Sequence, residues 1–336
     1  MEIDRPYLLF LGDVPDQLAA KTAHGIVDWR PEWCMGQLRL QGCKADCGLE
    51  DLTIKDAVVK GAKTMVVGVV NAGGVLPDHW IDSIVEALHA GLDVATGLHK
   101  RLASIPKIAE AAERHKRNLH DVRFSDMEFA TGKGTKRPGL RLLTVGTDCS
   151  VGKKYTALAL EKEMQARGLK AEFRATGQTG VFISGRGVAI DAVVADFIAG
   201  AAEWLTPAND DDHWDIVEGQ GSLFHPSFAG VTLGLLHGSQ PDAFIVCHEP
   251  TRTKMRGVQH RLPTIADVIE RTVLEGRLTN PRIQCTGIAV NTEHLEVEHA
   301  QAVLQKTALE LRLPCVDPMR TGVGPLVDEL LRRFHP

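Results

Sequence analysis

A glycine-bounded loop between an apolar run and a pair of lysines is the feature that most restricts the fold of this chain. Residues 142–145 are mostly apolar and predict a buried strand, 146–152 form a short polar loop, and Lys153 opens a segment of helical spacing. This order is typical of a phosphate-binding loop, in which main-chain N–H groups and a helix N-terminus surround an anion. The residues predicted to hold the anion are Gly146, Thr147, Asp148, Ser150, Val151, Gly152, Lys153 and Lys154.

The loop departs from the common pattern in two ways. Its spacing, G-x-x-x-x-x-G-K, has one residue more between the glycines than the usual form. Lys154 stands where a serine or threonine normally binds Mg²⁺. The loop is therefore expected to hold phosphate without a metal ion, and no metal site is predicted. Lys154 is interpreted either as a second phosphate contact or as a solvated lysine of the first helical turn.

Length and charge exclude several classes of partner. The 336 residues favour two domains over one, and the formal net charge of −5 gives no global electrostatic case for nucleic-acid binding. No apolar run approaches the roughly 20 residues of a membrane-spanning helix. The N-terminus lacks the basic-then-apolar order of a secretory signal. We expect a cytoplasmic protein without nucleic-acid or membrane partners.

Apolar, β-branched runs alternate with amphipathic segments along the chain, which predicts βαβ units and parallel sheets. Helices are expected, among other places, over 189–204 and 264–275. The segment 131–139 is Gly-rich, basic and free of apolar residues, and it is the predicted linker. The chain is therefore expected to divide into a domain at 1–130 and a domain at 140–336 that contains the phosphate-binding loop.

A second polar cluster, residues 218–226, follows the apolar run that ends at Val217. Such loops lie at the carboxyl edge of an open α/β sheet, where ligands bind. Glu218 is a candidate to bind a metal, to orient Lys153 or to act as a base. His225 is a candidate base because its ordinary pKa lies near neutrality, and a histidine bonded only to backbone is the alternative. Gln220 is placed with them in the catalytic group, and Ser222 among the substrate contacts.

Polar side chains that follow other predicted strands are candidate ligand contacts. Gln178 is suited to orient a substrate carbonyl, and Arg186 to pair with a carboxylate. His248 follows the strand predicted at 243–247, and Arg252 begins a short basic tract that suits a phosphate or a carboxylate. A solvated surface loop is the alternative for this tract.

Three weaker candidates complete the set. Asn291 ends the run 288–290, where an asparagine of related P-loop folds can contact a purine edge. In the first domain, residues 71–74 are interpreted as a second anion loop or a simple turn. His99 is interpreted as a site residue or a structural histidine.

These motifs resemble known families. Residues 146–153 are similar to the variant loop of dethiobiotin synthetases, which continues with threonine where this chain has Lys154. The combination of 146–154, 178–180, 218–222 and 248–252 resembles a smaller family, the bacterial D-glutamate N-acetyltransferases, over essentially the whole chain. That resemblance implies an α/β protein of two domains. The first is an N-terminal Rossmann-like parallel sheet, and the second a C-terminal P-loop NTPase-like, doubly wound parallel sheet.

The resemblance also implies a function. It implies transfer of acetyl from the co-substrate acetyl-CoA to the amino group of D-glutamate or a related amino acid, in a homodimer. On this interpretation the loop holds CoA phosphates, Glu218 or His225 is the base, and N–H groups of 219–222 stabilise the oxyanion. The substrate contacts are Gln178, Arg186, Ser222, His248 and Arg252. No acetyl-cysteine is expected, because Cys247 and His248 are strand neighbours that point opposite ways.

Three alternatives remain open at this stage. An ATP- and Mg²⁺-dependent ligase or kinase of the dethiobiotin synthetase type is opposed by Lys154. A non-catalytic nucleotide-binding regulator is opposed mildly by the many polar loops on one sheet edge. A dehydrogenase or epimerase would need G-x-G-x-x-G after the first strand, and residues 12–15 do not provide it.

Overall fold

The computed structural model describes residues 2–69, 76–98, 100–124 and 127–334. The chain divides into two compact units, each of which is described by itself below. The first unit comprises Met1–Met127 and Gly177–Ala192, and the second comprises Glu128–Thr176 and Val193–Pro336.

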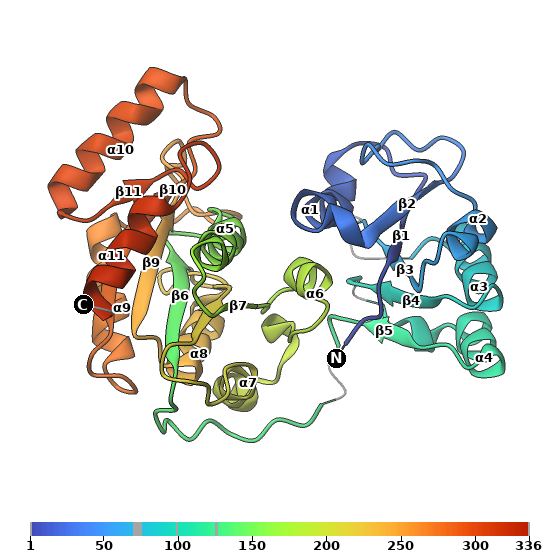
Figure 1. Ribbon diagram of the computed structural model, residues 1–336, viewed down its shortest axis with the longest axis horizontal. Coiled ribbons are helices and arrows are strands. Elements are labelled where there is room, and N and C mark those ends of the chain that lie inside the picture. The colour runs from blue at the N-terminus through green and yellow to red at the C-terminus, as the bar shows by residue number, and fades with distance from the viewer. Residues whose placement is uncertain (1, 70–75, 99, 125–126, 335–336) are drawn as a thin grey trace. The chain divides into compact units, whose positions relative to one another are not determined.

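The first unit contains a five-stranded parallel sheet of order β2-β1-β3-β4-β5 (Figure 1). Its first strand is buried along its whole length, as expected when helices cover both faces of a parallel sheet. The strands are β1 (Tyr7–Gly12), β2 (Cys34–Arg39), β3 (Thr64–Val67), β4 (Asp93–Thr96) and β5 (Leu119–Asp121). The helices are α1 (Lys21–Trp29), α2 (Ile54–Val59), α3 (Ile81–His89), α4 (Pro106–His115) and α6 (Gln178–Ser184).

Helix α6 belongs to the first unit although its sequence lies inside the second. It packs against α1, and the main-chain N–H of Ile3 donates to the carbonyl of Gly185 at 2.9 Å. Phe182 is fully buried there. The expected division into consecutive ranges therefore misses the segment Gly177–Ala192, because its apolar side chains find their packing partners in the first unit.

The second unit contains a six-stranded parallel sheet of order β11-β10-β9-β6-β8-β7. The strands are β6 (Leu140–Gly146), β7 (Ala171–Arg174), β8 (Trp214–Val217), β9 (Ala243–His248), β10 (Gln284–Val290) and β11 (Cys315–Val316). The helices are α5 (Lys153–Ala166), α7 (Ile198–Leu205), α8 (Ala229–Ser239), α9 (Ile265–Gly276), α10 (Val297–Leu311) and α11 (Gly324–Phe334). The predicted α/β class with parallel sheets is confirmed.

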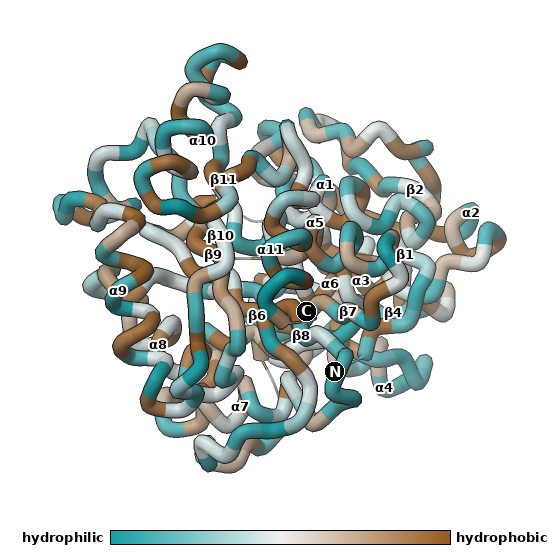
Figure 2. The backbone as a smooth tube through the Cα atoms, turned by 60° about the vertical axis from the view of Figure 1, so that its left-hand side comes forward, coloured by the Kyte–Doolittle hydropathy of each residue, from teal (hydrophilic) through white to brown (hydrophobic). Residues whose placement is uncertain are grey.

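Helices cover both faces of this second sheet. Leu143 and Val145 of β6 pack with Leu235 and Leu236 of α8. On the other face, α5 contacts β6, β7 and β8, and α11 contacts α5 and β10. Helix α9 alternates between hydrophobic and hydrophilic residues along its turns, as Figure 2 shows, and its apolar side joins the α8 cluster. The sheet is therefore doubly wound.

The segment predicted as a linker is a fixed part of the second unit. The main-chain N–H groups of Lys133 and Gly134 donate to Glu203 Oε1 at 2.9 and 2.8 Å. Lys136 Nζ lies 2.8 Å from Asp242 Oδ2. These bonds fix 131–139 along the edge of the unit, so its Gly-rich, polar composition does not make it a free connection.

The expectation of one helix over 189–204 is wrong. Short 3₁₀ turns occupy Ile190–Ala192 and Ala195–Phe197, and the α-helix begins only at Ile198. The chain passes from one unit to the other between Ala192 and Val193, which breaks the helix.

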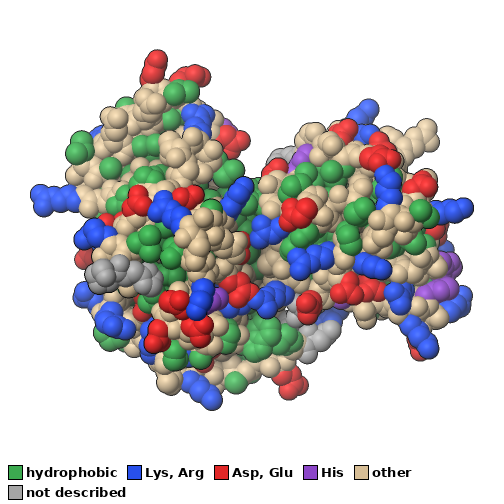
Figure 3. All heavy atoms as spheres, in the orientation of Figure 1, with side chains coloured by type: hydrophobic (Ala, Val, Ile, Leu, Met, Phe, Trp, Pro, Cys, Tyr) green, Lys and Arg blue, Asp and Glu red, His purple; other side chains and the backbone are tan. Residues whose placement is uncertain are grey.

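None of the helices in the described parts of the chain combines the length and the apolar character needed to span a bilayer. Positive and negative side chains are interspersed over the face shown in Figure 3.

Candidate functional site

The loops that could bind a ligand meet at the carboxyl edge of the second sheet. Strand β6 lies between β8 and β9. The chain leaves β6 toward α5 on one face, whereas it leaves β8 and β9 toward α8 and α9 on the other. Neighbouring strands whose connections run to opposite faces form a topological switch point, the usual ligand position in such sheets. The loops 147–152, 218–228 and 249–262 all start at this point.

The phosphate-binding loop has the backbone geometry that its glycines predict. Gly152 has a φ of +100° and caps the N-terminus of α5, and Ser150 has a φ of +55°. A Cβ at Gly146 would lie 2.7 Å from Val151 Cγ2, so only glycine fits this turn. The loop therefore presents main-chain N–H groups at the positive end of a 14-residue helix. This geometry suits the anion-binding role predicted for residues 146–153.

Lys153 is held inside the loop. Its side chain is 6% exposed, and its Nζ donates to the carbonyl oxygen of Asp148 at 2.8 Å. Burial lowers the pKa of Lys153, and the neighbouring acidic groups, including Asp148 and Glu218, oppose that shift. A buried ammonium that donates to a loop carbonyl can also donate to an anion entering the loop.

The side chain of Asp148 stabilises the conformation of the phosphate-binding loop. Its carboxylate has no solvent exposure and accepts from the N–H of Cys149, from Arg252 Nη1 at 2.7 Å and from the main-chain N–H of Arg256 at 2.8 Å. The carboxylate therefore holds the loop in shape, and the prediction that Asp148 contacts the phosphate, which would involve the main-chain N–H groups of the loop, stays a prediction.

Two arginines of the segment after β9 donate hydrogen bonds to the phosphate-binding loop. Arg252 Nη1 donates to the carbonyl of Cys149 at 2.7 Å, and Arg252 Nη2 to that of Ser150 at 3.3 Å. Arg256 Nη1 donates to Ser150 Oγ at 2.5 Å. The guanidinium of Arg252 is thus bonded to the loop, and the expectation that it binds a substrate carboxylate stays a prediction. The charge of Arg252 is paired with the carboxylates of Asp148 and Glu249, whereas the guanidinium of Arg256 adds positive charge beside Ser150.

Glu218 and Gln220 belong to a buried network with Thr176. Glu218 is 4% exposed, and its Oε2 accepts from the main-chain N–H of Thr176 at 3.0 Å. Gln220 Nε2 donates to Thr176 Oγ1 at 3.2 Å. A Cβ at Gly219 would lie 1.6 Å from the carbonyl oxygen of Thr144, so the loop after β8 runs against β6. The Glu218 carboxylate therefore fixes the start of the loop after β7, and its charge opposes the fall in the pKa of Lys153.

His225 has both ring nitrogens engaged with backbone. The N–H of Ser227 donates to Nδ1 at 3.2 Å, so the proton lies on Nε2, which donates to the carbonyl of Arg256 at 3.0 Å. The side chain is 1% exposed. This geometry fits the alternative weighed from the sequence, a histidine bonded to backbone, better than the role of a base.

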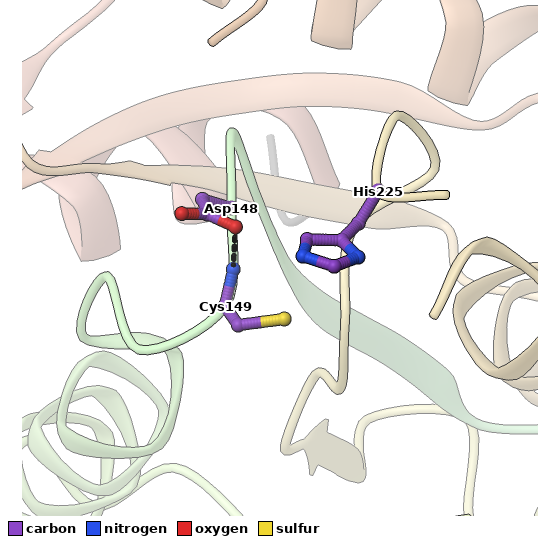
Figure 4. Close-up of side chains that lie close together, drawn as sticks. All are labelled: Asp148, Cys149 and His225. Atoms are coloured by element: carbon purple, nitrogen blue, oxygen red, sulfur yellow. Dashed lines mark hydrogen bonds between the residues drawn. The ribbon is translucent and has the colours of Figure 1, made fainter. Parts of the chain in front are cut away.

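Asp148, Cys149 and His225 lie close together, as Figure 4 shows, with one possible metal-ligand atom of each within 4.8 Å of the others. The thiol of Cys149 points toward the imidazole in this view. Burial raises the pKa of that thiol, although Lys153 and the arginines act in the opposite direction. Because Asp148 and His225 are already hydrogen-bonded to protein groups, a metal ion would have to displace those bonds.

A second group of possible metal ligands, Glu172, His213 and Asp215, lies near the amino ends of β7 and β8, away from the loop. The guanidinium of Arg174 forms ion pairs with the two carboxylates of this group. Its Nη2 is 2.8 Å from Glu172 Oε2 and its Nε is 2.7 Å from Asp215 Oδ1.

The remaining residues of this unit that the sequence predicts for the site contact neighbouring protein groups. Thr147 Oγ1 and His248 Nδ1 are 3.0 Å apart, and burial lowers the pKa of His248. Ser222 Oγ accepts from the N–H of Phe224. Asn291 Oδ1 accepts from the N–H of Glu293 and closes a turn, and Lys154 Nζ lies 4.7 Å from the ring centroid of Tyr155.

Gln178 and Arg186 lie in the first unit, whereas the phosphate-binding loop lies in the second, and their role as substrate contacts stays a prediction. Gln178 packs on Gly97, where a Cβ would approach its Cγ to 3.0 Å, and Arg186 is exposed. The candidates at 71–74 and His99 lie outside the described residues.

Sequence reasoning missed two residues of the site. Thr176, which joins Glu218 to Gln220, follows β7 and carries no motif signal. Arg256 belongs to the basic tract that the sequence marks, but its contact with Ser150 depends on the fold of the segment after β9, in which the described residues 249–262 form no helix.

The two units define a class: a Rossmann-like domain followed by a P-loop domain, both with parallel sheets. The family model described as the DUF1611_N Rossmann-like domain matches residues 38–125, and that described as the DUF1611_C P-loop domain, of unknown function, matches residues 128–327. The chain belongs to the DUF1611 family.

Relatives extend over the whole chain. It is 54% identical over 329 residues to a D-glutamate N-acetyltransferase of Tritonibacter scottomollicae, covering 98% of this chain and 99% of the relative. It is 50% identical over 331 residues to a protein of that name from a Pseudoalteromonas species, covering 98% and 100%. A crystal structure of a DUF1611 family protein from Anabaena variabilis is similar, with a TM-score of 0.85, 29% identity and coverage of 98% and 100%.

Proposed function

We propose that this protein transfers the acetyl group of acetyl-CoA to the amino group of D-glutamate. The observation that carries the proposal is its identity of 54% and 50%, over 98% of the chain, to two proteins named D-glutamate N-acetyltransferase. The substrate, the acetyl donor and the predicted homodimer are parts of the proposal.

The phosphate-binding loop is suited to bind the phosphates of coenzyme A without the help of a metal ion. Coenzyme A carries a 5′-diphosphate and a 3′-phosphate, and acetyl transfer moves no phosphoryl group. Lys153 and Arg256 supply positive charge at the loop, and Lys154 replaces the hydroxyl that would bind Mg²⁺. We propose that the loop holds the diphosphate.

Acetyl transfer to an amine also requires catalytic groups at the reacting atoms. A base takes a proton from the substrate ammonium, the amine nitrogen attacks the thioester carbon, and donors stabilise the oxyanion of the tetrahedral intermediate. The C–S bond then breaks, and the CoA sulfur leaves and takes up a proton. The thioester lies at the far end of the pantetheine arm from the diphosphate. We therefore propose that Glu218, Gln220 and His225 position the loop, and that the base lies farther along the bound coenzyme.

A thiol-release assay tests the reaction. The protein is given acetyl-CoA with D-glutamate, L-glutamate, D-aspartate and D-glutamine in turn, and the acetylated product is identified by mass spectrometry. We expect fastest release with D-glutamate, because the relatives carry that substrate in their names. No release with any of these amines, or turnover of MgATP in a parallel reaction, contradicts the proposal and favours a ligase or kinase.

A substitution at Lys153 tests the loop. Lys153→Met keeps the volume of the buried side chain but removes its charge, so the acetyl-CoA KM should rise by about tenfold or more, the effect of losing a charge-assisted hydrogen bond. The D-glutamate KM should stay within about twofold of the wild type. The control is Lys162→Met, which changes an exposed lysine of the same helix. An unchanged acetyl-CoA KM in Lys153→Met contradicts the role of the loop.

A further inference from the structure

The segment after β9 folds into a short basic hairpin over residues 251–262. Lys254 and Arg261 form an antiparallel bridge, the N–H of Met255 donates to the carbonyl of His260 at 2.8 Å, and Met255 is buried beneath the hairpin. The hairpin contains four arginines and lysines (Arg252, Lys254, Arg256 and Arg261) and no acidic residue.

Like charges oppose each other across this hairpin. Lys254 and Arg261 are bridge partners and both are exposed. Like charges directly opposite each other destabilise an antiparallel pair. The contact made by Lys254 Nζ within the hairpin is with Gln259 Oε1, a neutral group, so it does not cancel the charge. A hairpin built in this way is stabilised when an anion binds between the cations.

The hairpin is attached to the phosphate-binding loop. The main-chain N–H of Arg256 donates to Asp148 Oδ2 at 2.8 Å, and its Nη1 donates to Ser150 Oγ at 2.5 Å. Met255 is buried, so the exposed side chains of Lys254 and Arg256 flank it on the outer side of the hairpin. Arg256 thus connects the phosphate-binding loop to the hairpin that carries the pair Lys254 and Arg261.

We propose that the basic hairpin binds the 3′-phosphate of coenzyme A, an inference that rests on the proposed function. The 3′-phosphate is carried by the same ribose as the 5′-diphosphate, so a diphosphate in the loop places a second dianion beside the rim. Lys254, Arg256 and Arg261 provide the charges that this dianion needs. The hairpin therefore selects coenzyme A over 3′-dephospho-CoA and over ADP.

Equilibrium binding tests the inference without requiring turnover. Calorimetric titrations of CoA and 3′-dephospho-CoA are compared for the wild type and for the double variant Lys254→Ala/Arg261→Ala. The wild type should bind CoA about tenfold or more tightly than 3′-dephospho-CoA. The double variant should lose that preference because its CoA Kd rises, while its 3′-dephospho-CoA Kd stays within about twofold.

Two further variants give the experiment its controls. Lys254→Arg/Arg261→Lys keeps both charges and should keep the preference. Arg277→Ala/Arg282→Ala removes two exposed arginines outside the hairpin and should leave both Kd values unchanged.

The outcomes separate this inference from the proposed function. Equal wild-type affinity for the two coenzymes, no binding of either, or an equal loss for both in the double variant overturns the inference. A CoA preference that depends on the hairpin, in a protein that acetylates no amino acid, supports the inference and contradicts the proposed function.

Discussion

Asp148 shows how the residues of the phosphate-binding loop depend on distant parts of the chain. Its carboxylate accepts hydrogen bonds from Arg252 and from the backbone of Arg256, more than 100 positions away. His225 accepts from the main-chain N–H of Ser227 and donates to the carbonyl of Arg256, the residue whose N–H bonds to Asp148. The loop, the hairpin and the segment after β8 are therefore one hydrogen-bonded assembly, and a change in one residue is expected to reach the others.

A substitution at His225 tests whether the ring is structural. His225→Gln removes part of the ring's hydrogen bonding, and it should destabilise the protein by about 1–3 kcal/mol because buried backbone groups lose their partners. The acetyl-CoA KM should rise while kcat stays within about threefold. Urea unfolding and steady-state kinetics measure both effects.

The matched control is His237→Gln, since His237 also bonds to a backbone carbonyl, that of Glu275, away from the loop. It should lower stability without a change in KM. If His225→Gln instead keeps its unfolding midpoint and loses kcat by about 100-fold, His225 is the base after all.

His248 gives the stability of the protein a dependence on pH. Burial lowers the pKa of His248 in the folded state, with Arg252 acting in the same direction and Glu249 opposing it. Below the unfolded pKa of about 6.5 the unfolded chain binds more protons than the folded one, so the free energy of unfolding falls as pH falls. One such group contributes a slope of at most about 1.4 kcal/mol per pH unit.

His248→Gln removes this contribution, so its free energy of unfolding should fall less steeply than that of the wild type from pH 7 down to pH 5.5. Urea unfolding at several pH values measures the difference. The exposed His294, changed to glutamine, is the control and should keep the wild-type slope. Identical slopes for His248→Gln and the wild type would show that His248 is not the cause.

The parts of the site that the sequence predicts are those set by short spacing. Gly146, Gly152 and Lys153 lie within eight residues, and local backbone sterics and the helix N-terminus determine their roles. The roles of Asp148, His225 and Arg252 depend on partners that only the sheet topology brings close. A carboxylate or histidine that is satisfied by the protein has the same sequence signature as one that contacts a ligand.

At the scale of elements, helices α7 and α8 show where local sequence is insufficient. Helix α8 contains Gly234 and Gly238, which disfavour a helix by roughly 1 kcal/mol each relative to alanine. A Cβ at Gly238 would lie 2.1 Å from the carbonyl oxygen of Ala199, and one at Gly234 would lie 2.5 Å from Ile198 Cγ2. Close packing of the two helices requires these glycines, so tertiary contact rather than propensity stabilises α8.

Helix α9 is the opposite case, because its start was predicted within one residue from local signals. Thr264 and Asp267 form a capping box, in which each side chain accepts from the other residue's main-chain N–H. Such signals act over one turn and are readable in the sequence.

Removal of this cap gives an element-scale prediction. Thr264→Ala should lower the free energy of unfolding by about 1 kcal/mol, and Thr264→Ser, which keeps the hydroxyl, should recover most of it. Thermal or urea unfolding measures both. Equal stability of Thr264→Ala and the wild type would show that Asp267 and solvent replace the cap.

At the scale of the whole molecule, the chain passes between the two units three times, after Met127, after Thr176 and after Ala192. The parallel sheets follow from the alternation of strands and helices. The exchange of Gly177–Ala192 does not, because nothing in its composition says which core buries Phe182 and Ile183.

A fragment experiment tests this exchange. Residues 128–336 expressed alone should aggregate or bind a hydrophobic dye, since Val181, Phe182 and Ile183 lose the unit that buries them. The same fragment with 177–192 replaced by a Gly/Ser segment of equal length should be monomeric and unfold cooperatively. Equal solubility and cooperativity of the two fragments would show that these side chains find burial within the second unit.

The placement of α6 also sets an order of events during synthesis. The ribosome makes β6, the phosphate-binding loop and α5 before it makes the helix that completes the first unit. Domains commonly fold one after another from the N-terminus as they emerge. Here the first unit is complete only when Ala192 has been made, 65 residues after Met127, and until then both units are exposed to chaperones as incomplete structures.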